Sequence, residues 1–309
     1  MQITRRNALL GAASLPFLGA LNPAFAQNAK ISVGHVTASD FAPIVVGPQK
    51  GLFAKHGVDV TAVKLPIIVH TPPGLVSNSI QIGAATIPVL LAAVDGGLDL
   101  VLVSGGSRHV REQSKIGLAV RSDFNYSGPG DLKGKKIAVA GLNSTMDIFV
   151  RKWMKDRGVD LREVKMIEAQ FPAMPDMLKG GVVDAAVVTD PIRSRIVESG
   201  QGKIVSDFFA EMYADVLMIC YIATRQWADA NRKTIEGFRA GLVETDKWMS
   251  ANWAEASAME KQAFGFTSAK APTGLSIVAT PADLKVYIDV GNEFGLYQTK
   301  LDPEKLIWK

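Results

Sequence analysis

The sequence predicts an α/β protein with two similar lobes, each a mainly parallel β-sheet flanked by helices. Two observations support this fold class. A block from the first third of the chain occurs again, with substitutions, in the middle third. In both copies, short apolar runs alternate with helical segments, a pattern typical of parallel sheets covered on both faces. A chain of 309 residues is also long enough to bury the cores of two lobes without disulfides.

The repeat consists of three pairs of matching blocks. Each copy has the order strand, helix, strand, short helix, strand. A glycine, Gly57 or Gly158, ends the first helix region of each copy, as expected of a residue that accepts the left-handed conformation. We therefore predict one lobe from 27–117 plus 218–309 and the other from 118–217. The matching pairs are Lys30–Gly34 with Lys136–Ala140, Phe53–Lys64 with Met154–Lys165, and Leu75–Pro88 with Leu178–Pro191.

Two β-like runs, Lys115–Val120 and Ala214–Tyr221, stand at the predicted lobe boundaries and are expected to form a hinge. The chain then becomes helical. Apolar residues at helical spacing predict three helices that pack back on the first lobe. Trp248 and Trp253 are interpreted as core residues there rather than as ligand-stacking residues. The three helices are Thr234–Met249, Asn252–Phe264 and Pro281–Phe294.

Ligands of open parallel sheets bind beyond the carboxyl ends of the strands. Two such sheets facing each other would form one cleft. The segments at those ends are rich in Ser, Thr, Gly and Pro. They are 36–42, 84–88 and 104–109 in the first lobe, and 140–146, 170–174 and 189–191 in the second.

The first residues have the features of an export signal. Arg5 and Arg6 precede a short apolar run, and small residues at Ala24 and Ala26 form a cleavage site, so we predict that residues 1–26 are removed after Ala26. The arginine pair indicates the twin-arginine route, with the Sec route as the alternative. The mature protein is then expected in the periplasm.

Composition excludes several classes of function. Basic and acidic residues nearly balance, 34 against 30, which argues against nucleic-acid binding. Cys220 is the only cysteine, so no internal disulfide forms. The sequence contains no phosphate-binding glycine motif and no metal-ligand spacing. We expect no cofactor, no metal and a monomer.

Three segments in this order resemble the periplasmic binding proteins for sulfonates, taurine and nitrate, whose relatives include thiamine-pyrimidine binders. The resemblance covers nearly the whole mature chain. It implies a type II periplasmic-binding-protein fold, a small-molecule ligand between the lobes, and delivery to an ABC permease driven by its ATPase. The segments are Phe41–Val60, Asp131–Val139 followed by Asn143–Thr145, and Val183–Pro191.

Nine residues are candidates for ligand contact, some from position and some from the resemblance. Ser144 and Thr145 precede a predicted helix, Met146–Arg157, where free N–H groups favour an anion, although they would also serve as plain caps. Arg108 either faces the cleft or belongs to a solvated charged surface. We interpret His109 as part of such a solvated surface. The nine candidates are Thr37, Ser39, Phe41, Thr86, Arg108, Ser144, Thr145, Asp190 and Asp215.

The predicted ligand is a small anion of the sulfonate, nitrate or carboxylate class. Because of Asp190 and Asp215, a neutral or zwitterionic ligand such as a pyrimidine or taurine is the alternative. Asp190 would also serve as a helix cap. An enzyme resembling thiamine-pyrimidine synthases is a rival hypothesis, but it needs a cysteine cluster that this chain lacks. A sensory receptor is a second rival, which would need a fused signalling segment. We therefore predict a binding protein and no enzyme.

Overall fold

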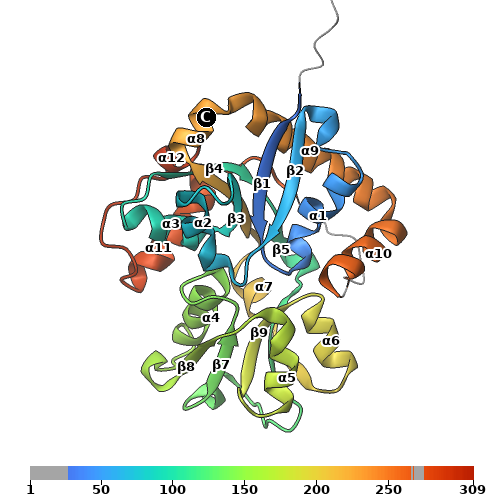
Figure 1. The fold of residues 1–309 in the computed structure, drawn as a ribbon. Coiled ribbons are helices and arrows are strands. Elements are labelled where there is room, and N and C mark those ends of the chain that lie inside the picture. Colours follow the sequence, from blue (N-terminus) through green and yellow to red (C-terminus); the bar gives the residue numbers. More distant parts are fainter. Residues whose placement is uncertain (1–26, 266, 268–274) are drawn as a thin grey trace, which may run out of the picture.

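The computed structural model describes residues 27–265, 267 and 275–309, so the predicted leader lies outside the described residues. It contains two five-stranded sheets, one in each lobe (Figure 1). The first has the order β2-β1-β3-β12-β4, and the second has the order β10-β6-β9-β7-β8. The strands of the first are β1 Ala29–His35, β2 Val58–Lys64, β3 Ile82–Thr86, β4 Leu100–Gly105 and β12 Ile219–Thr224; those of the second are β6 Ile116–Arg121, β7 Lys136–Val139, β8 Lys165–Glu168, β9 Ala185–Thr189 and β10 Gly202–Ser206.

The two sheets have the same topology, which confirms the predicted duplication. β1 pairs in parallel with β2 and β3, as β7 does with β8 and β9. One antiparallel strand, β12 or β6, then follows on the other side of β3 or β9. Gly57 and Gly158 both have the expected left-handed backbone, with φ of 76° and 79°.

Helices cover both faces of each sheet, as Figure 1 shows. In the first lobe α1, α9 and α10 lie on one side, and α2, α3 and α11 lie on the other. The three predicted carboxyl-terminal helices are present and pack on α1, α3 and β2. The helices are α1 Ala42–Gln49, α2 Thr71–Val76, α3 Ile87–Asp95, α4 Thr145–Lys155, α5 Met174–Lys179, α6 Ile192–Glu198, α7 Phe208–Met212, α8 Arg225–Ala230, α9 Arg232–Ala251, α10 Trp253–Phe264, α11 Pro281–Glu293 and α12 Pro303–Leu306.

The central strands are apolar throughout because both of their faces are covered. Every residue of β3 and of β9 is buried. Trp248 and Trp253 are half-buried beside a small cluster that includes Val46 and Met249, which confirms their packing role.

Two chain segments, 106–115 and 207–218, connect the sheets within the described chain. Each contains one short strand, β5 Arg108–Val110 or β11 Asp215–Leu217, and these two strands pair with each other in antiparallel fashion. The runs predicted as crossing strands mostly belong to the sheets themselves, as β6 and β12. The connection between the sheets therefore consists of the β5–β11 pair and its flanking residues.

Helix α11 belongs to the first lobe but also contacts the second. It packs on both α3 and α4. Tyr287 of α11 is fully buried, its ring lies 5.1 Å from that of Phe149 in α4, and its hydroxyl donates a 2.6 Å hydrogen bond to the carbonyl of Leu217. Tyr287 thus links α11, α4 and the β5–β11 connection.

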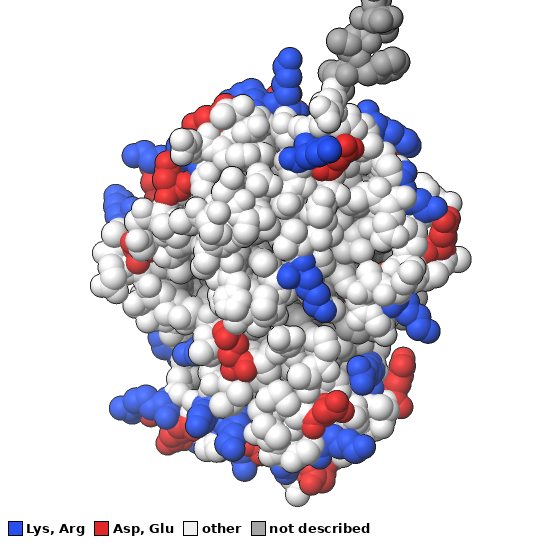
Figure 2. All heavy atoms as spheres, viewed as in Figure 1, with Lys and Arg blue, Asp and Glu red and all other residues white. Residues whose placement is uncertain are grey.

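The surface carries mixed charges. On the face shown in Figure 2, basic and acidic side chains are interspersed over both lobes. This mixture fits the near balance of charges in the sequence.

Removing the Tyr287 hydroxyl tests its linking role. We predict that Tyr287→Phe lowers the free energy of unfolding by about 1 to 3 kcal/mol, because a buried carbonyl loses its donor. Tyr126→Phe is the matched control, because burial is also the main influence on the Tyr126 hydroxyl and raises its pKa to about 12. Urea unfolding measures both variants, and equal stability of the two would contradict the role given to Tyr287.

Candidate ligand-binding site

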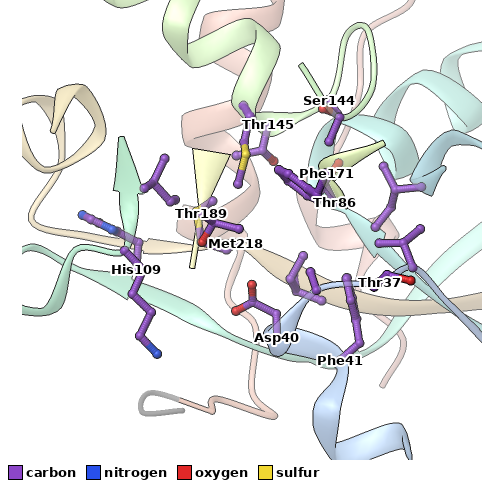
Figure 3. Close-up of a pocket in the computed structure, with 18 of the residues that line it drawn as sticks. Thr37, Asp40, Phe41, Thr86, His109, Ser144, Thr145, Phe171, Thr189 and Met218 are labelled. Carbon is purple, nitrogen blue, oxygen red and sulfur yellow. The ribbon is translucent and has the colours of Figure 1, made fainter. Parts of the chain in front are cut away.

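A pocket lies where the carboxyl ends of the strands in the two sheets face each other (Figure 3). Its volume is about 100 Å³, several times the 10–15 Å³ that one water needs by this measure. All six predicted loop segments contribute to it. The lining residues from those segments are Val36, Thr37, Ala38, Asp40, Phe41, Thr86, Arg108, His109, Ala140, Ser144, Thr145, Met146, Gln170, Phe171, Pro172 and Thr189.

The topology explains why the connecting segments also line the pocket. A strand that pairs in antiparallel fashion begins at the edge of the sheet where the neighbouring strand ends. Accordingly, Ile219 at the start of β12 pairs with Thr86 at the end of β3, and Ile116 at the start of β6 pairs with Thr189 at the end of β9. All four residues line the pocket. The lobe connection and the pocket therefore share residues.

Sequence reasoning missed a further wall of the pocket, Pro66–Ile68. These residues follow β2, which runs parallel to β1 and so ends at the same edge. The rule applied to the other strands would have found them.

Six of the nine candidates line the pocket, and ligand contact by them stays a prediction. They are Thr37, Phe41, Thr86, Arg108, Ser144 and Thr145. Ser39, Asp190 and Asp215 are not among its lining residues. Asp190 accepts hydrogen bonds from the backbone and hydroxyl of Ser194, so it caps α6. Asp215 is exposed and pairs with Arg108.

Buried hydroxyl groups without partners lie on the pocket wall. Thr37 and Thr86 are each 8% exposed, and neither hydroxyl has a hydrogen-bond partner among the described residues. The Thr145 hydroxyl lies near the Tyr287 hydroxyl and acts to lower the pKa of Tyr287. The oxygen of Thr145 nevertheless lacks a hydrogen-bond partner of standard geometry among the described residues. Burial still raises the pKa of Tyr287 strongly overall. Buried polar groups normally form hydrogen bonds, so these hydroxyls are the groups for which a bound ligand would supply the missing partner.

Ser144 differs from these threonines. It stands immediately before α4, but its hydroxyl donates a 2.7 Å hydrogen bond to the carbonyl of Gly141. Its side chain therefore already has a partner within its own loop.

The positive charges that favoured an anion are largely compensated. Arg108 donates to Asp215 at 2.7 Å and to Asp283 at 2.8 Å. The first turn of α4 contains the buried Asp147, which accepts a hydrogen bond from the backbone of Asn143. Burial raises the pKa of Asp147, while its ion pair with Arg151 acts in the opposite direction.

The interpretation of His109 as part of a solvated surface is wrong. Its side chain is 5% exposed and lies edge-on against Phe209, with ring centroids 4.7 Å apart. Burial lowers the pKa of His109, and a hydrogen bond to the backbone of Tyr213 acts in the opposite direction. The pairing of β5 with β11 buries this side chain, which local charge patterning did not predict.

Two charged residues of the pocket were not among the candidates. Asp40 comes from the turn after β1, and Lys115 immediately precedes β6. In the turn that holds Asp40, the sequence favoured the neighbouring Ser39 for ligand contact. Apolar side chains form most of the remaining wall, including Phe41, Ile68 and Phe171.

Two further searches of the described residues gave no match. No group of three or more metal-ligating side chains was found in 27–265, 267 and 275–309. None of the helices described here has the length and apolar character needed to span a bilayer.

The fold is that of the periplasmic binding proteins. The solved structure of the alkanesulfonate-binding protein SsuA from Xanthomonas axonopodis pv. citri, bound to MOPS, superposes with a TM-score of 0.78 and covers 92% of this chain and 99% of that one. The two sequences are 19% identical, so the likeness concerns the fold.

The chain belongs to the NMT1-like family, whose sequence profile it matches over residues 25–262. It is 23% identical to the bicarbonate-binding protein CmpA of Synechococcus elongatus, over 90% of this chain and 65% of that protein. It is also 23% identical to the nitrate/nitrite binding protein NrtA of a Nostoc species, over 75% of this chain and 56% of that protein. The chain thus spans less than two thirds of the length of these curated relatives.

The hydroxyl groups give a stability test that needs no ligand. We predict that Thr86→Val leaves the free energy of unfolding unchanged or raises it by up to about 1 kcal/mol, because the lost hydroxyl has no partner. Ser144→Ala should lower it by about 1 kcal/mol, because its hydrogen bond to Gly141 is lost. Chemical unfolding of the free protein measures both. A loss for Thr86→Val as large as that for Ser144→Ala would show that Thr86 is already satisfied.

Proposed function

We propose that this protein is an exported solute-binding protein that captures a small organic ligand between its two lobes. The single observation that carries the proposal is a pocket whose walls come from corresponding edges of two duplicated sheets, with unpartnered buried hydroxyls such as Thr37 and Thr86. A ligand that contacts both sheets favours the closed arrangement by its differential affinity for that arrangement. This geometry supports capture by lobe closure.

The walls favour an organic ligand over a small inorganic anion. Binding sites for small molecules are mostly apolar with a few placed polar groups. Phe41, Ile68 and Phe171 would contact an apolar body, while threonine hydroxyls would meet its polar groups. Nitrate and bicarbonate, for which the relatives are named, have no apolar body to fill such a site.

The proposed role is binding without catalysis. The rival enzyme hypothesis depends on cysteine chemistry, and Cys220 is fully buried with a pKa that burial raises strongly. A thiol of this kind gives no thiolate nucleophile. Cys220 packs in β12 as a small apolar residue.

The proposed partners are an ABC permease and its ATPase, by analogy with importers served by proteins of this fold. Lobe 1 is assigned to 27–117 plus 218–309, and lobe 2 to 118–217, with the protein acting as a monomer in the periplasm. Residues 1–26 would direct export.

A ligand screen tests the proposed function directly. We predict that at least one small organic molecule among carboxylates, sulfonates, amines, pyrimidines and amino acids raises the melting temperature of the mature protein. A ligand at about 100 times its Kd adds about 2.7 kcal/mol to the stability of the folded state. Thr86→Val should then weaken the best ligand by about tenfold while leaving free-protein stability intact. If no member of the panel stabilises the protein, the proposal fails.

Export is tested separately through the arginine pair. We predict that Arg5→Lys combined with Arg6→Lys leaves uncleaved precursor in the cytoplasm, as cell fractionation and immunoblotting would detect. Replacing Lys30 by Arg, beyond the predicted cleavage site, is the control. Normal processing of the double variant would exclude the twin-arginine route and leave the Sec route.

A further inference from the structure

The pocket contains a carboxylate without a partner. Asp40 lies in the 3₁₀ turn Ser39–Phe41 that follows β1, and in Figure 3 its carboxylate points into the pocket. It forms no ion pair and no hydrogen bond with any residue of the described chain. This distinguishes Asp40 from Asp190 and Asp215, which are both paired.

The surroundings of Asp40 make a partner necessary when the lobes close. Phe41 and Phe171, at 2% and 9% exposed, are two of the apolar walls. Closure around a ligand removes water from this space, and a carboxylate without water or a partner is costly in apolar surroundings. A ligand that brings its own counter-charge removes that cost.

The other charges of the pocket leave two sources of a partner. Arg108 is already held by Asp215 and Asp283. Lys115 also lines the pocket and forms no ion pair with the described residues, and His109 lines it with an Nε2 that has no hydrogen-bond partner, so these two side chains are the internal candidates there. An anionic ligand would instead place a second negative charge beside Asp40.

We propose that Asp40 binds a positively charged or N–H-bearing nitrogen group of the ligand. The ligand class is then small amines, amidines and amino-substituted heterocycles with an apolar body. An amidine or aminoheterocycle presents two N–H groups that match a carboxylate, and the aromatic walls suit the apolar body of such a ligand. This assignment rests on the proposed function and narrows its ligand class.

Three probes that share one ring but differ in charge test the assignment. They are the cation benzamidine, the neutral benzamide and the anion benzoate. Titration calorimetry with the mature protein should give the highest affinity for benzamidine, a lower affinity for benzamide and the lowest affinity for benzoate. Asp40→Asn should weaken benzamidine by at least about tenfold, change benzamide by less than about threefold, and strengthen benzoate. Asp289→Asn is the matched control, since this exposed aspartate of α11 carries the same charge outside the pocket.

Lys115→Met separates ligand recognition from an internal ion pair. If Asp40 serves the ligand, removing Lys115 leaves benzamidine binding unchanged or stronger. If Asp40 and Lys115 pair with each other on closure, both variants weaken all three probes alike, which would overturn the assignment.

Two other outcomes would also count against it. Binding of benzoate, methanesulfonate or nitrate without benzamidine or benzamide would overturn the assignment and leave the proposed function standing. No binding by any of these probes at millimolar concentration would overturn the assignment, while the wider ligand screen decides the proposed function separately.

Discussion

The short antiparallel pair between β5 and β11 is the constraint on which the arrangement of the two lobes depends. The two segments that connect the sheets meet in this three-residue ladder, and backbone hydrogen bonds from Met218 to Ser107 and from Arg111 to Ala214 extend it on both sides. Arg108 adds ion pairs to β11 through Asp215 and to α11 through Asp283. Because the ladder is narrow, the proposed rotation of the lobes about it would break neither sheet.

This connection also fixes where the pocket lies. Each connecting segment must enter the next sheet at the edge where the parallel strands end, since β6 and β12 run antiparallel to their neighbours. The ends of the parallel strands hold Thr86 and Thr189, and the antiparallel strands bring Ile116 and Ile219 beside them. The proposed movement at the connection would therefore act directly on the walls of the pocket.

Much of this arrangement could be predicted from the sequence because duplication and strand periodicity are local signals. The repeat indicated two lobes, and the rule about strand ends located six loop segments of the pocket but was not applied to the end of β2, so that Pro66–Ile68 was missed. The pairing of individual side chains could not be predicted. Asp283 contacts Arg108 from a helix 175 residues away, and no local pattern indicates that contact. His109 was misplaced for the same reason, since its burial depends on Phe209 from a distant segment.

The electrostatics of the pocket differ from those expected of a site for small anions. The arginine and the helix N-terminus that would attract an anion are compensated by Asp215, Asp283 and Asp147. What the pocket presents to a ligand is an apolar wall, several hydroxyls, and the side chains of Asp40, His109 and Lys115. Proteins that share this fold can thus differ in the ligand that their sites accept.

The central claim is capture by closure of the two lobes, and a distance across the cleft tests it most directly. Val76 in α2 and Val182 after α5 are 57% and 54% exposed, and Cys220 is fully buried, so cysteines introduced at those two positions can be spin-labelled selectively. Pulsed electron paramagnetic resonance then gives the distance between the labels with and without ligand. The account predicts a shorter and narrower distribution when the ligand saturates the protein. An unchanged distribution at saturation would contradict it.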